Sequence, residues 1–298
     1  MQQKIIVALI TFLVTSFGIV SNSLVFIATR KMSSMNSSFG VITKNQVTCN
    51  FIVSSVYLFY ISPLQISNIK LMLDYSHFIG VFDITVYENS NLSHFLIASN
   101  RFCAVFLPFY YDNVFTIFST KVYRNVIWVT ATVWCIVFYE VVECHLAYNV
   151  EAWSLVFLDT EVGAKVTWYT DFTLNTFFVV LTFTTNLLTA FKAGRNSRMM
   201  TNAAGLQTSK LQKQRELNFL KQTFFTGLSV LFGHVAYYLI APFVSNSVLM
   251  FCFGSLYVFM HCVEGAIILA SNPEMRSVLK PRKTSPSTSA NVILIIRK

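Results

Sequence analysis

The chain has 298 residues, of which 54% are hydrophobic and only 12% are charged. A soluble domain carries about 25% charged residues, and 35 Lys, Arg, Asp and Glu side chains cannot cover the surface of a soluble protein of this length. The net charge of +9 would suit nucleic acid only if the basic residues formed a water-facing stripe, but here they fall between apolar runs. The composition therefore indicates a membrane protein that does not bind nucleic acid.

Seven segments are predicted to cross the membrane, because each is close to the roughly 20 apolar residues that a spanning helix needs. They are 5–29, 39–63, 77–100, 125–143, 167–191, 219–243 and 247–270. Hydropathy alone defines five of them, whereas the second and third contain several polar residues. We therefore predict an all-α membrane protein in which residues 1–276 form a seven-helix bundle. Residues 277–298 are predicted to be a disordered cytoplasmic tail.

The basic residues predict the orientation of the bundle. With the N-terminus outside and the C-terminus in the cytoplasm, 19 of the 22 Lys and Arg residues face the cytoplasm, and Lys4, Lys70 and Lys165 are the exceptions. This distribution follows the rule that cytoplasmic loops are rich in Lys and Arg. The segment 207–222 contains helix-forming residues without Gly or Pro, so the sixth helix should extend into the cytoplasm.

The third segment is predicted to lie inside the bundle. At 100° per residue its polar side chains share one face, and they are Asp83, Tyr87, Ser90, Asn91, His94 and Arg101. Asp83 and Arg101 are five turns apart, or about 27 Å along the axis. We predict a ligand pocket at Asp83, Tyr87 and Asn91. The alternatives for Asp83 are a counter-charge, for a cationic ligand or for a partner on another helix, and a protonated, hydrogen-bonded structural acid. Glu88 points away from this face and should meet a neighbouring helix.

Three motifs resemble those of rhodopsin-like receptors. Asn100-Arg101-Phe102, followed by Pro108 and Tyr111, resembles the cytoplasmic end of the third helix, and the segment 21–25 around Asn22 resembles part of the first. Asn272-Pro273-Glu274-Met275-Arg276 is similar to the start of the eighth, membrane-surface helix. The resemblance implies a seven-helix receptor in which Asn100, Arg101, Phe102, Pro108 and Tyr111 couple to a heterotrimeric G protein.

Longer segments resemble one family more closely. SHFLIASNRFCAVFLPFYYDNVFT, FGVITKNQVTCNFIV, WYTDF and HCVEGAIILASNPEMR resemble the nematode serpentine receptors of class x (Srx). The resemblance implies an orphan chemosensory receptor of the plasma membrane, in the cilium of a sensory neuron, which binds an unknown small molecule and contacts membrane lipid. It implies no enzymatic activity, cofactor or metal, and it leaves the oligomeric state open.

The chain departs from the rhodopsin-like pattern in several places. Ser76 replaces the cysteine that ties the third helix to the second outer loop, so that disulfide cannot form. Asn100 replaces the acid beside Arg101, which should weaken the resting lock. Glu264-Gly265 stands where an Asn-Pro-x-x-Tyr motif begins, and it forms either an ion or proton site or a polar switch with close packing at Gly265. Switch or structural roles are expected for Asn22, Asn50, Glu264, Gly265, Asn272, Pro273 and Arg276.

Some alternatives remain open from the sequence. Cys144 and Cys252 either form a disulfide on the outer side or are free thiols. A small transporter or a ligand-gated channel could also use a polar pathway through such a bundle. A transporter would show inverted repeats and helices broken by Gly or Pro, and a channel of the insect odorant-receptor type would place the N-terminus in the cytoplasm.

Overall fold

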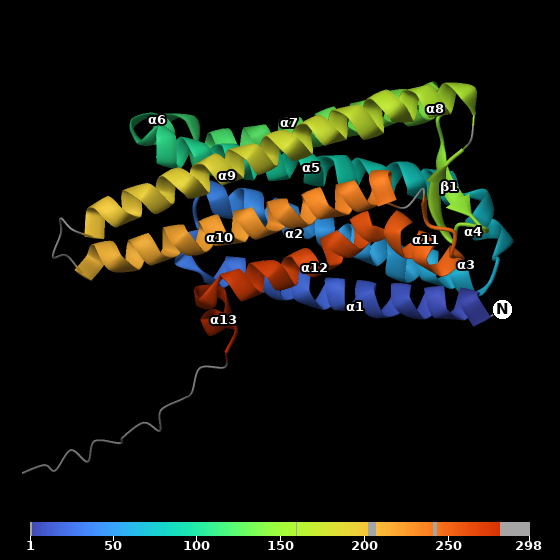
Figure 1. The fold of residues 1–298 in the computed structure, drawn as a ribbon, viewed down its shortest axis with the longest axis horizontal. Coiled ribbons are helices and arrows are strands. Elements are labelled where there is room, and N and C mark those ends of the chain that lie inside the picture. The colour runs from blue at the N-terminus through green and yellow to red at the C-terminus, as the bar shows by residue number, and fades with distance from the viewer. Residues whose placement is uncertain (1, 159, 202–206, 241–242, 281–298) are drawn as a thin grey trace, which may run out of the picture.

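A computed structural model describes residues 2–158, 160–201, 207–240 and 243–280 of the chain. Most of these residues belong to long helices that lie side by side (Figure 1). The elements of the first half are α1 (Gln2–Lys31), η1 (Ser33–Met35), α2 (Ser38–Val56), η2 (Tyr57–Ile61), α3 (Ser62–Ile66), α4 (Lys70–Asp74), α5 (Ser76–Phe106), α6 (Pro108–Val114), α7 (Ile117–Cys135) and η3 (Ile136–Val141). Those of the second half are β1 (Leu146–Asn149), β2 (Ser154–Phe157), α8 (Glu161–Thr167), η4 (Trp168–Thr173), α9 (Leu174–Thr201), α10 (Gln207–Val235), η5 (Ala236–Ile240), α11 (Ser247–Gly254), α12 (Leu256–Ser271) and α13 (Pro273–Leu279).

Five of the described helices are long and apolar enough to cross a membrane. They are Gln2–Lys31, Ser38–Ile66, Ile117–Val141, Glu161–Ala193 and Leu217–Ile240. The helices α11 and α12 qualify together as a sixth, and they are bent by 57° at the break between them. The 31-residue helix α5 is not among these candidates, because polar side chains lower its hydropathy.

Helix α5 lies in the interior of the bundle, as its polar face predicts. It contacts α2, α7, α9 and α10. The side chains of Asp83, Asn91, His94 and Arg101 are all buried. A helix that is covered by other helices does not have to present an apolar surface to lipid, which explains how so polar a segment can occupy this place.

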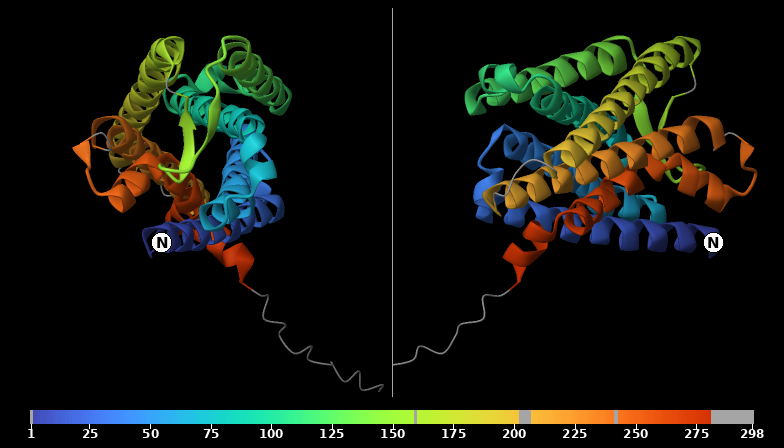
Figure 2. Two further views of the ribbon diagram at one scale, coloured as in Figure 1. Left: turned by 90° about the vertical axis from the view of Figure 1, so that its right-hand side faces the viewer. Right: turned by 60° about the vertical axis from the view of Figure 1, so that its left-hand side comes forward.

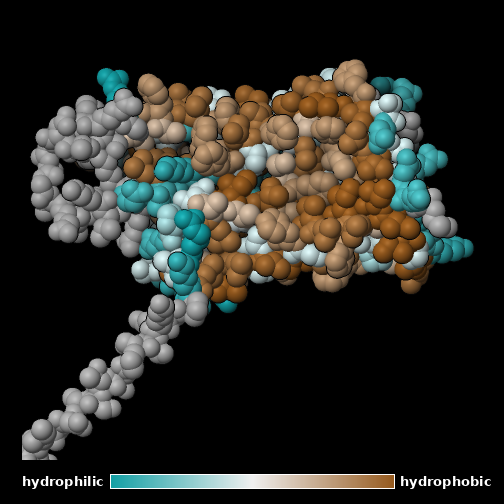
Figure 3. Space-filling view, turned by 60° about the horizontal axis from the view of Figure 1, so that its bottom comes forward, coloured by the Kyte–Doolittle hydropathy of each residue, from teal (hydrophilic) through white to brown (hydrophobic). Residues whose placement is uncertain are grey.

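The outer surface of the bundle is apolar. Figure 3 shows a broad hydrophobic band with hydrophilic residues gathered at its two ends. Large exposed side chains contribute to this surface on α1, α7, α9 and α10, among them Phe12, Val20, Val129, Val133, Phe177, Leu188 and Phe232. A soluble protein rarely exposes so large an apolar surface, and the chain is therefore a multi-pass membrane protein.

The seven predicted segments are helical over most of their described residues, although their ends differ and Ser255 interrupts the seventh. The fourth begins eight residues earlier than predicted, at Ile117, and the sixth begins at Gln207, in agreement with the predicted extension. Its predicted end at 243 includes residues 241 and 242, which lie outside the described residues. The predicted tail also starts too early, because α13 continues to Leu279, and residues 281–298 lie outside the described part.

A two-stranded hairpin departs from the all-α prediction. β1 pairs antiparallel with β2, with Leu146 opposite Phe157 and Asn149 opposite Ser154. The Oδ1 atom of Asn149 accepts the backbone N–H groups of Glu151 and Ala152, which stabilises the turn. Strands of four residues give little periodic signal, and a hairpin alone is unstable in water, so the sequence did not predict it.

The hairpin defines one end of the bundle. Viewed from that end, it lies across the middle of the ring of helices (Figure 2, left). The N-terminus lies at the same end, and α6 and α13 lie at the opposite one (Figure 1). We call the end that carries β1 and β2 the hairpin end, and the opposite end, where α5 finishes, the Arg101 end.

Candidate functional site

A cavity lies beneath the hairpin, inside the bundle. Its wall is formed by α5, the two strands, η4, α10, η5 and α12. The lining residues are Ile84, Tyr87, Asn91, Leu146, Leu155, Phe157, Asp171, Val230, Gly233, His234, Tyr237, Tyr238, Tyr257, Met260, His261 and Glu264. Two of the three predicted pocket residues, Tyr87 and Asn91, are thus brought together in one wall.

Asp83, the third predicted pocket residue, is not part of this wall. Its side chain is 1% exposed, and neither carboxylate oxygen makes a hydrogen bond of normal geometry, although the Tyr257 hydroxyl is close enough to interact with it. Asp83 is therefore not placed to contact a ligand in this cavity directly. The helical pattern placed Asp83 on the correct face of α5 but could not show which residues cover it.

The acid that does face the cavity near the hairpin is Asp171, which the sequence analysis missed. Its Oδ2 atom accepts a hydrogen bond of 2.5 Å from the Tyr238 hydroxyl, and its Oδ1 atom accepts one of 3.2 Å from Asn175 Nδ2. The same Nδ2 atom donates to Glu88 Oε1 at 2.9 Å. Glu88 therefore meets a neighbouring helix, as predicted. A signal existed, because Asp171 is the acid in the segment WYTDF.

Asp171 and its tyrosine partner lie in two helical turns that are wider than an α-helix. Asp171 belongs to the π-helical turn η4, and Tyr237 and Tyr238 belong to the π-helical turn η5. Such turns are frequent at functional sites, because the extra residue re-aims the side chains around it. The two turns are joined by the bond between Asp171 and Tyr238.

A second cavity adjoins the first at the hairpin end. It is lined by the hairpin together with residues of α8, η4, η5 and α11. Five residues line both cavities, namely Leu155, Phe157, Asp171, Tyr237 and Tyr238. Asp171 therefore stands at the boundary between the two.

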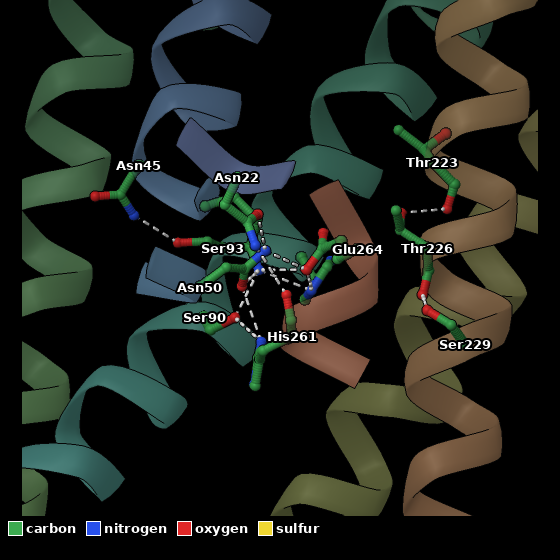
Figure 4. A network of polar contacts seen from close by, with 12 residues as sticks. Asn22, Asn45, Asn50, Ser90, Ser93, Thr223, Thr226, Ser229, His261 and Glu264 are labelled. Atoms are coloured by element: carbon green, nitrogen blue, oxygen red, sulfur yellow. Dashed lines mark hydrogen bonds and ion pairs between the residues drawn. The ribbon is translucent and has the colours of Figure 1, made fainter. Parts of the chain in front are cut away.

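A cluster of polar side chains lies deeper in the bundle, at the floor of the first cavity (Figure 4). We call it the central polar cluster, and it consists of Asn22, Gln46, Asn50, Ser90, His94, His261 and Glu264, contributed by α1, α2, α5 and α12. Glu264 Oε2 accepts from Asn50 Nδ2 at 2.7 Å and lies 3.5 Å from His94 Nε2. His261 Nδ1 lies 2.9 Å from Asn50 Oδ1. The sequence analysis named five of these residues, Asn22, Asn50, Ser90, His94 and Glu264, but only the fold brings His94 to Glu264 and His261 to Asn50.

Gly265 allows α1 and α12 to approach closely. A Cβ atom at Gly265 would lie 2.7 Å from the backbone nitrogen of Asn22, a distance that real Cβ atoms do not reach. At the same contact Asn22 Nδ2 donates to the carbonyl oxygen of His261 at 3.2 Å. The geometry at Gly265 is thus that of close packing beside a polar group, which is one of the two alternatives drawn from the sequence.

Arg101 lies against two aromatic rings at the opposite end of α5. Its guanidinium carbon lies 3.6 Å from the ring centroid of Phe39 on α2 and 4.9 Å from that of Phe219 on α10. The two rings are themselves 4.7 Å apart. A guanidinium on an aromatic face is attracted by the charge distribution of the ring, so Arg101 links α2 and α10 across α5.

The neighbours of Arg101 fix the adjoining turn. Asn100 Nδ2 donates to Ser38 Oγ at 3.2 Å and to the Tyr111 hydroxyl at 3.3 Å. Pro108 begins α6, which carries Tyr111. Phe102 stacks on Phe106, with 4.3 Å between the ring centroids, and takes no part in this contact. Asn100 and Tyr111 are therefore brought together, whereas Phe102 is directed elsewhere.

The residues predicted to begin an eighth helix do so. The Asn272 side chain accepts the backbone N–H of Met275 at 3.3 Å, and Pro273 occupies the first turn of α13, where its missing N–H costs nothing. Arg276 Nη1 donates to the carbonyl oxygens of Leu269 and Ala270, the latter by a very short contact. These contacts turn the chain sharply at the end of α12.

The hairpin is attached to α5 without a disulfide. Ser76 Oγ accepts the backbone N–H of Tyr148 at 3.2 Å. A Cβ atom at Gly80 would lie 1.9 Å from the carbonyl oxygen of Leu146, so only glycine admits the strand here. Cys144 and Cys252 are both free thiols, which is the second of the alternatives drawn from the sequence.

Comparison with known proteins places this arrangement in a class of receptors. Residues 12–272 match the family described as serpentine type 7TM GPCR chemoreceptor Srx. The chain belongs to this family.

Two curated relatives come from Caenorhabditis elegans. Serpentine receptor class X 45 is 24% identical over 294 residues, which cover 92% of this chain and 81% of the relative. Serpentine receptor class X-43 is 22% identical over 281 residues, covering 91% of this chain and 85% of the relative. The family expected from the sequence motifs is confirmed.

Proposed function

We propose that this protein is a chemosensory receptor with seven membrane spans, which binds a small molecule at the hairpin end and activates a heterotrimeric G protein at the Arg101 end. One observation carries the proposal: α5 contributes Tyr87 and Asn91 to the cavity wall and places Arg101 at its other end. The hairpin end and the N-terminus then face outside, and α13 faces the cytoplasm of a sensory neuron, with the plasma membrane of its cilium as the expected location.

The proposed mechanism is a shift between two arrangements of the bundle. A ligand shifts such an equilibrium only by its difference in affinity for the two states. The central polar cluster joins four helices directly below the cavity, so a change in the cavity wall reaches α1, α2, α5 and α12 together.

Arg101 serves as the resting lock in this mechanism. Asn100 is bound to Ser38 and Tyr111, and Arg101 rests on the rings of Phe39 and Phe219. When α10 moves away, Phe219 leaves Arg101. The guanidinium can then meet the C-terminal carbonyl groups of a G-protein helix, where a cation is favourable.

A nucleotide-exchange assay in cells that express the chain tests this function. A screen of small molecules should find one that raises exchange, and Arg101→Ala should abolish the response. Arg30→Ala is the matched control, because Arg30 rests on Phe26 of its own helix at 5.1 Å and joins no second helix. A response that survives in Arg101→Ala but depends on Arg30 would contradict the proposal.

Tags at the two termini separate this receptor from a channel. An N-terminal tag should be accessible to antibody on intact cells, and a C-terminal tag should become accessible only after permeabilisation. The reverse result would favour a ligand-gated channel of inverted topology.

A further inference from the structure

We propose that the cavity beneath the hairpin binds a small organic cation, with its ammonium group held by Asp171 and enclosed by tyrosine rings. This names the ligand class of the receptor and rests on the proposed function for the cellular response, although not for binding itself. Two carboxylates, Asp171 and Glu264, line the cavity, and none of the described lining residues is Lys or Arg.

Asp171 has the capacity to accept a further donor. An ionised carboxylate has about four lone-pair sites on its two oxygens. The bonds from Tyr238 and Asn175 use one site on each oxygen. The partners also orient the carboxylate, and the position of Asp171 in both cavities places it on the route from the second cavity into the first.

Tyrosine rings form a continuous aromatic wall near this acid. Ring centroids are 5.4 Å apart for Tyr87 and Tyr257, 6.2 Å for Tyr257 and Tyr237, and 4.7 Å for Tyr237 and Tyr238. All four residues line the cavity. A cation within about 6 Å of such a ring is attracted to its face, which is how aromatic cages recognise quaternary ammonium groups.

Glu264 supplies a second negative group at the floor of the cavity. Its contacts with Asn50, Gln46 and His94 all reach Oε2. The histidines of the wall are themselves bonded, His261 to Asn50 and His234 to Thr176 Oγ1 at 2.7 Å. The groups that face the cavity thus favour a cation over an anion, because an anionic ligand would need Lys, Arg or free donors in the wall.

A binding experiment with charged and uncharged partners tests the ligand class. Purified receptor is heated with choline or with its uncharged carbon isostere 3,3-dimethylbutan-1-ol, and with 2-phenylethylamine or 2-phenylethanol. At least one of the two ammonium compounds should raise the melting temperature of the receptor at a concentration at which its uncharged partner does not. The proposal would be overturned if each uncharged compound stabilised the receptor as much as its ammonium partner, or if neither ammonium compound stabilised it.

Variants then locate the site. Asp171→Asn should weaken binding of the ammonium compound by at least about 30-fold, the loss expected when one partner of a buried charge pair is removed. Tyr257→Leu should weaken it by about 3- to 30-fold. Asp74→Asn is the control, because this exposed carboxylate on α4 lines neither cavity. An equal effect of Asp74→Asn would move the site away from Asp171.

Folding and coupling are separated by two further measurements. If Asp171→Asn does not fold, Tyr238→Phe serves instead: it keeps the carboxylate and the ring, and should retain the preference for the charged compound. Loss of that preference in folded Tyr238→Phe would contradict the role of Asp171. An ammonium compound that binds without raising nucleotide exchange would support the ligand class but count against the proposed coupling to a G protein. Exchange raised by uncharged compounds alone would support the coupling but contradict the ligand class.

Discussion

The two ends of the bundle place polar groups in opposite surroundings. At the hairpin end the carboxylate of Asp171 lies at the boundary of two cavities, held by hydrogen bonds from Tyr238 and Asn175. At the Arg101 end a guanidinium is packed against the rings of Phe39 and Phe219. The first arrangement leaves room for a ligand beside the charge, whereas the second covers the charge with side chains that must move before a partner can reach it.

The difference shows where small changes in energy can have large consequences. The hairpin end is fixed by backbone contacts, such as that of Gly80 with Leu146, which cannot give way without moving a strand. At the Arg101 end the contacts are made by side chains, and the stacking of Arg101 on Phe39 and Phe219 contributes about 0.5–2 kcal/mol. We infer that the cavity is the rigid part of the molecule and that the lock at Arg101 is the part that changes.

Gly80→Ala should have the largest effect, because it attacks the rigid end. The new Cβ atom would lie 1.9 Å from the Leu146 carbonyl oxygen, so the hairpin must move. We expect a loss of about 2–3 kcal/mol in the free energy of unfolding and loss of ligand binding, measured by thermal unfolding of the purified protein. Gly254→Ala is the control, since no atom lies within 4 Å of its added Cβ. Equal stability of the two variants would show that the hairpin is not fixed at Gly80.

Asn50→Leu should be the next most damaging, because it breaks the link between the two ends. Glu264 loses its 2.7 Å donor, and a buried charged acceptor without that bond costs about 1–3 kcal/mol or more. The unfolding free energy should fall accordingly, and adding Glu264→Gln should restore part of it. Ser55→Ala on the same helix, whose hydroxyl bonds only to Phe51 O, should change little. If the losses of unfolding free energy in the two single variants simply added in the double variant, Asn50 and Glu264 would not be coupled.

Phe219→Leu should open the lock at Arg101 while leaving the cavity unchanged. Loss of the ring removes a contact of about 0.5–2 kcal/mol, which corresponds to a roughly 2- to 30-fold rise in the active population. The rate of nucleotide exchange in the absence of ligand measures this active population. Phe232→Leu, an exposed position on the same helix, is the control. Unchanged basal exchange in Phe219→Leu would mean that the stacking does not restrain activation.

Ser76→Ala should weaken the attachment of the hairpin slightly. The backbone N–H of Tyr148 loses its acceptor, which should cost about 0.5–1.5 kcal/mol of unfolding free energy. Ser67→Ala, at an exposed hydroxyl bonded to Pro63 O, gives the baseline in the same thermal assay. An effect as large as that of Gly80→Ala would mean that this hydrogen bond, rather than the close packing, holds the hairpin.

The labelling rate of Cys144 should show that this thiol is buried at the hairpin end. Of the predicted effects, this one is the smallest. Burial raises the pKa of its thiol to about 11, so the reactive thiolate is the minor form at neutral pH. Labelling by a maleimide should therefore rise about tenfold per pH unit between pH 8 and 10. The Cys144→Ser variant identifies its share of the label. A rate that levels off near pH 9 would show a thiol with the ordinary pKa of an exposed cysteine, and no labelling at any pH would show a thiol that is already paired.

The sequence alone determined the class of protein, the positions of the helices and the motifs at the Arg101 end. These features depend on local composition and spacing: apolar runs of sufficient length, a polar face with helical period on α5, and the Asn100-Arg101-Phe102 and Asn272-Pro273 motifs. Such patterns are visible because lipid requires every spanning segment to satisfy its own backbone. The family was evident from the same segments.

Only the tertiary structure decided which polar groups face the cavity. Asp83 and Asp171 are both acids in helical segments, but the first is buried outside the cavity wall, whereas the second, in the π-helical turn η4, lines the cavity. Likewise, residues far apart in the chain meet where Arg101 contacts Phe39 and Phe219 and where Glu264 contacts His94 and Asn50. These contacts depend on the rotation and packing of helices against one another, which no local pattern encodes.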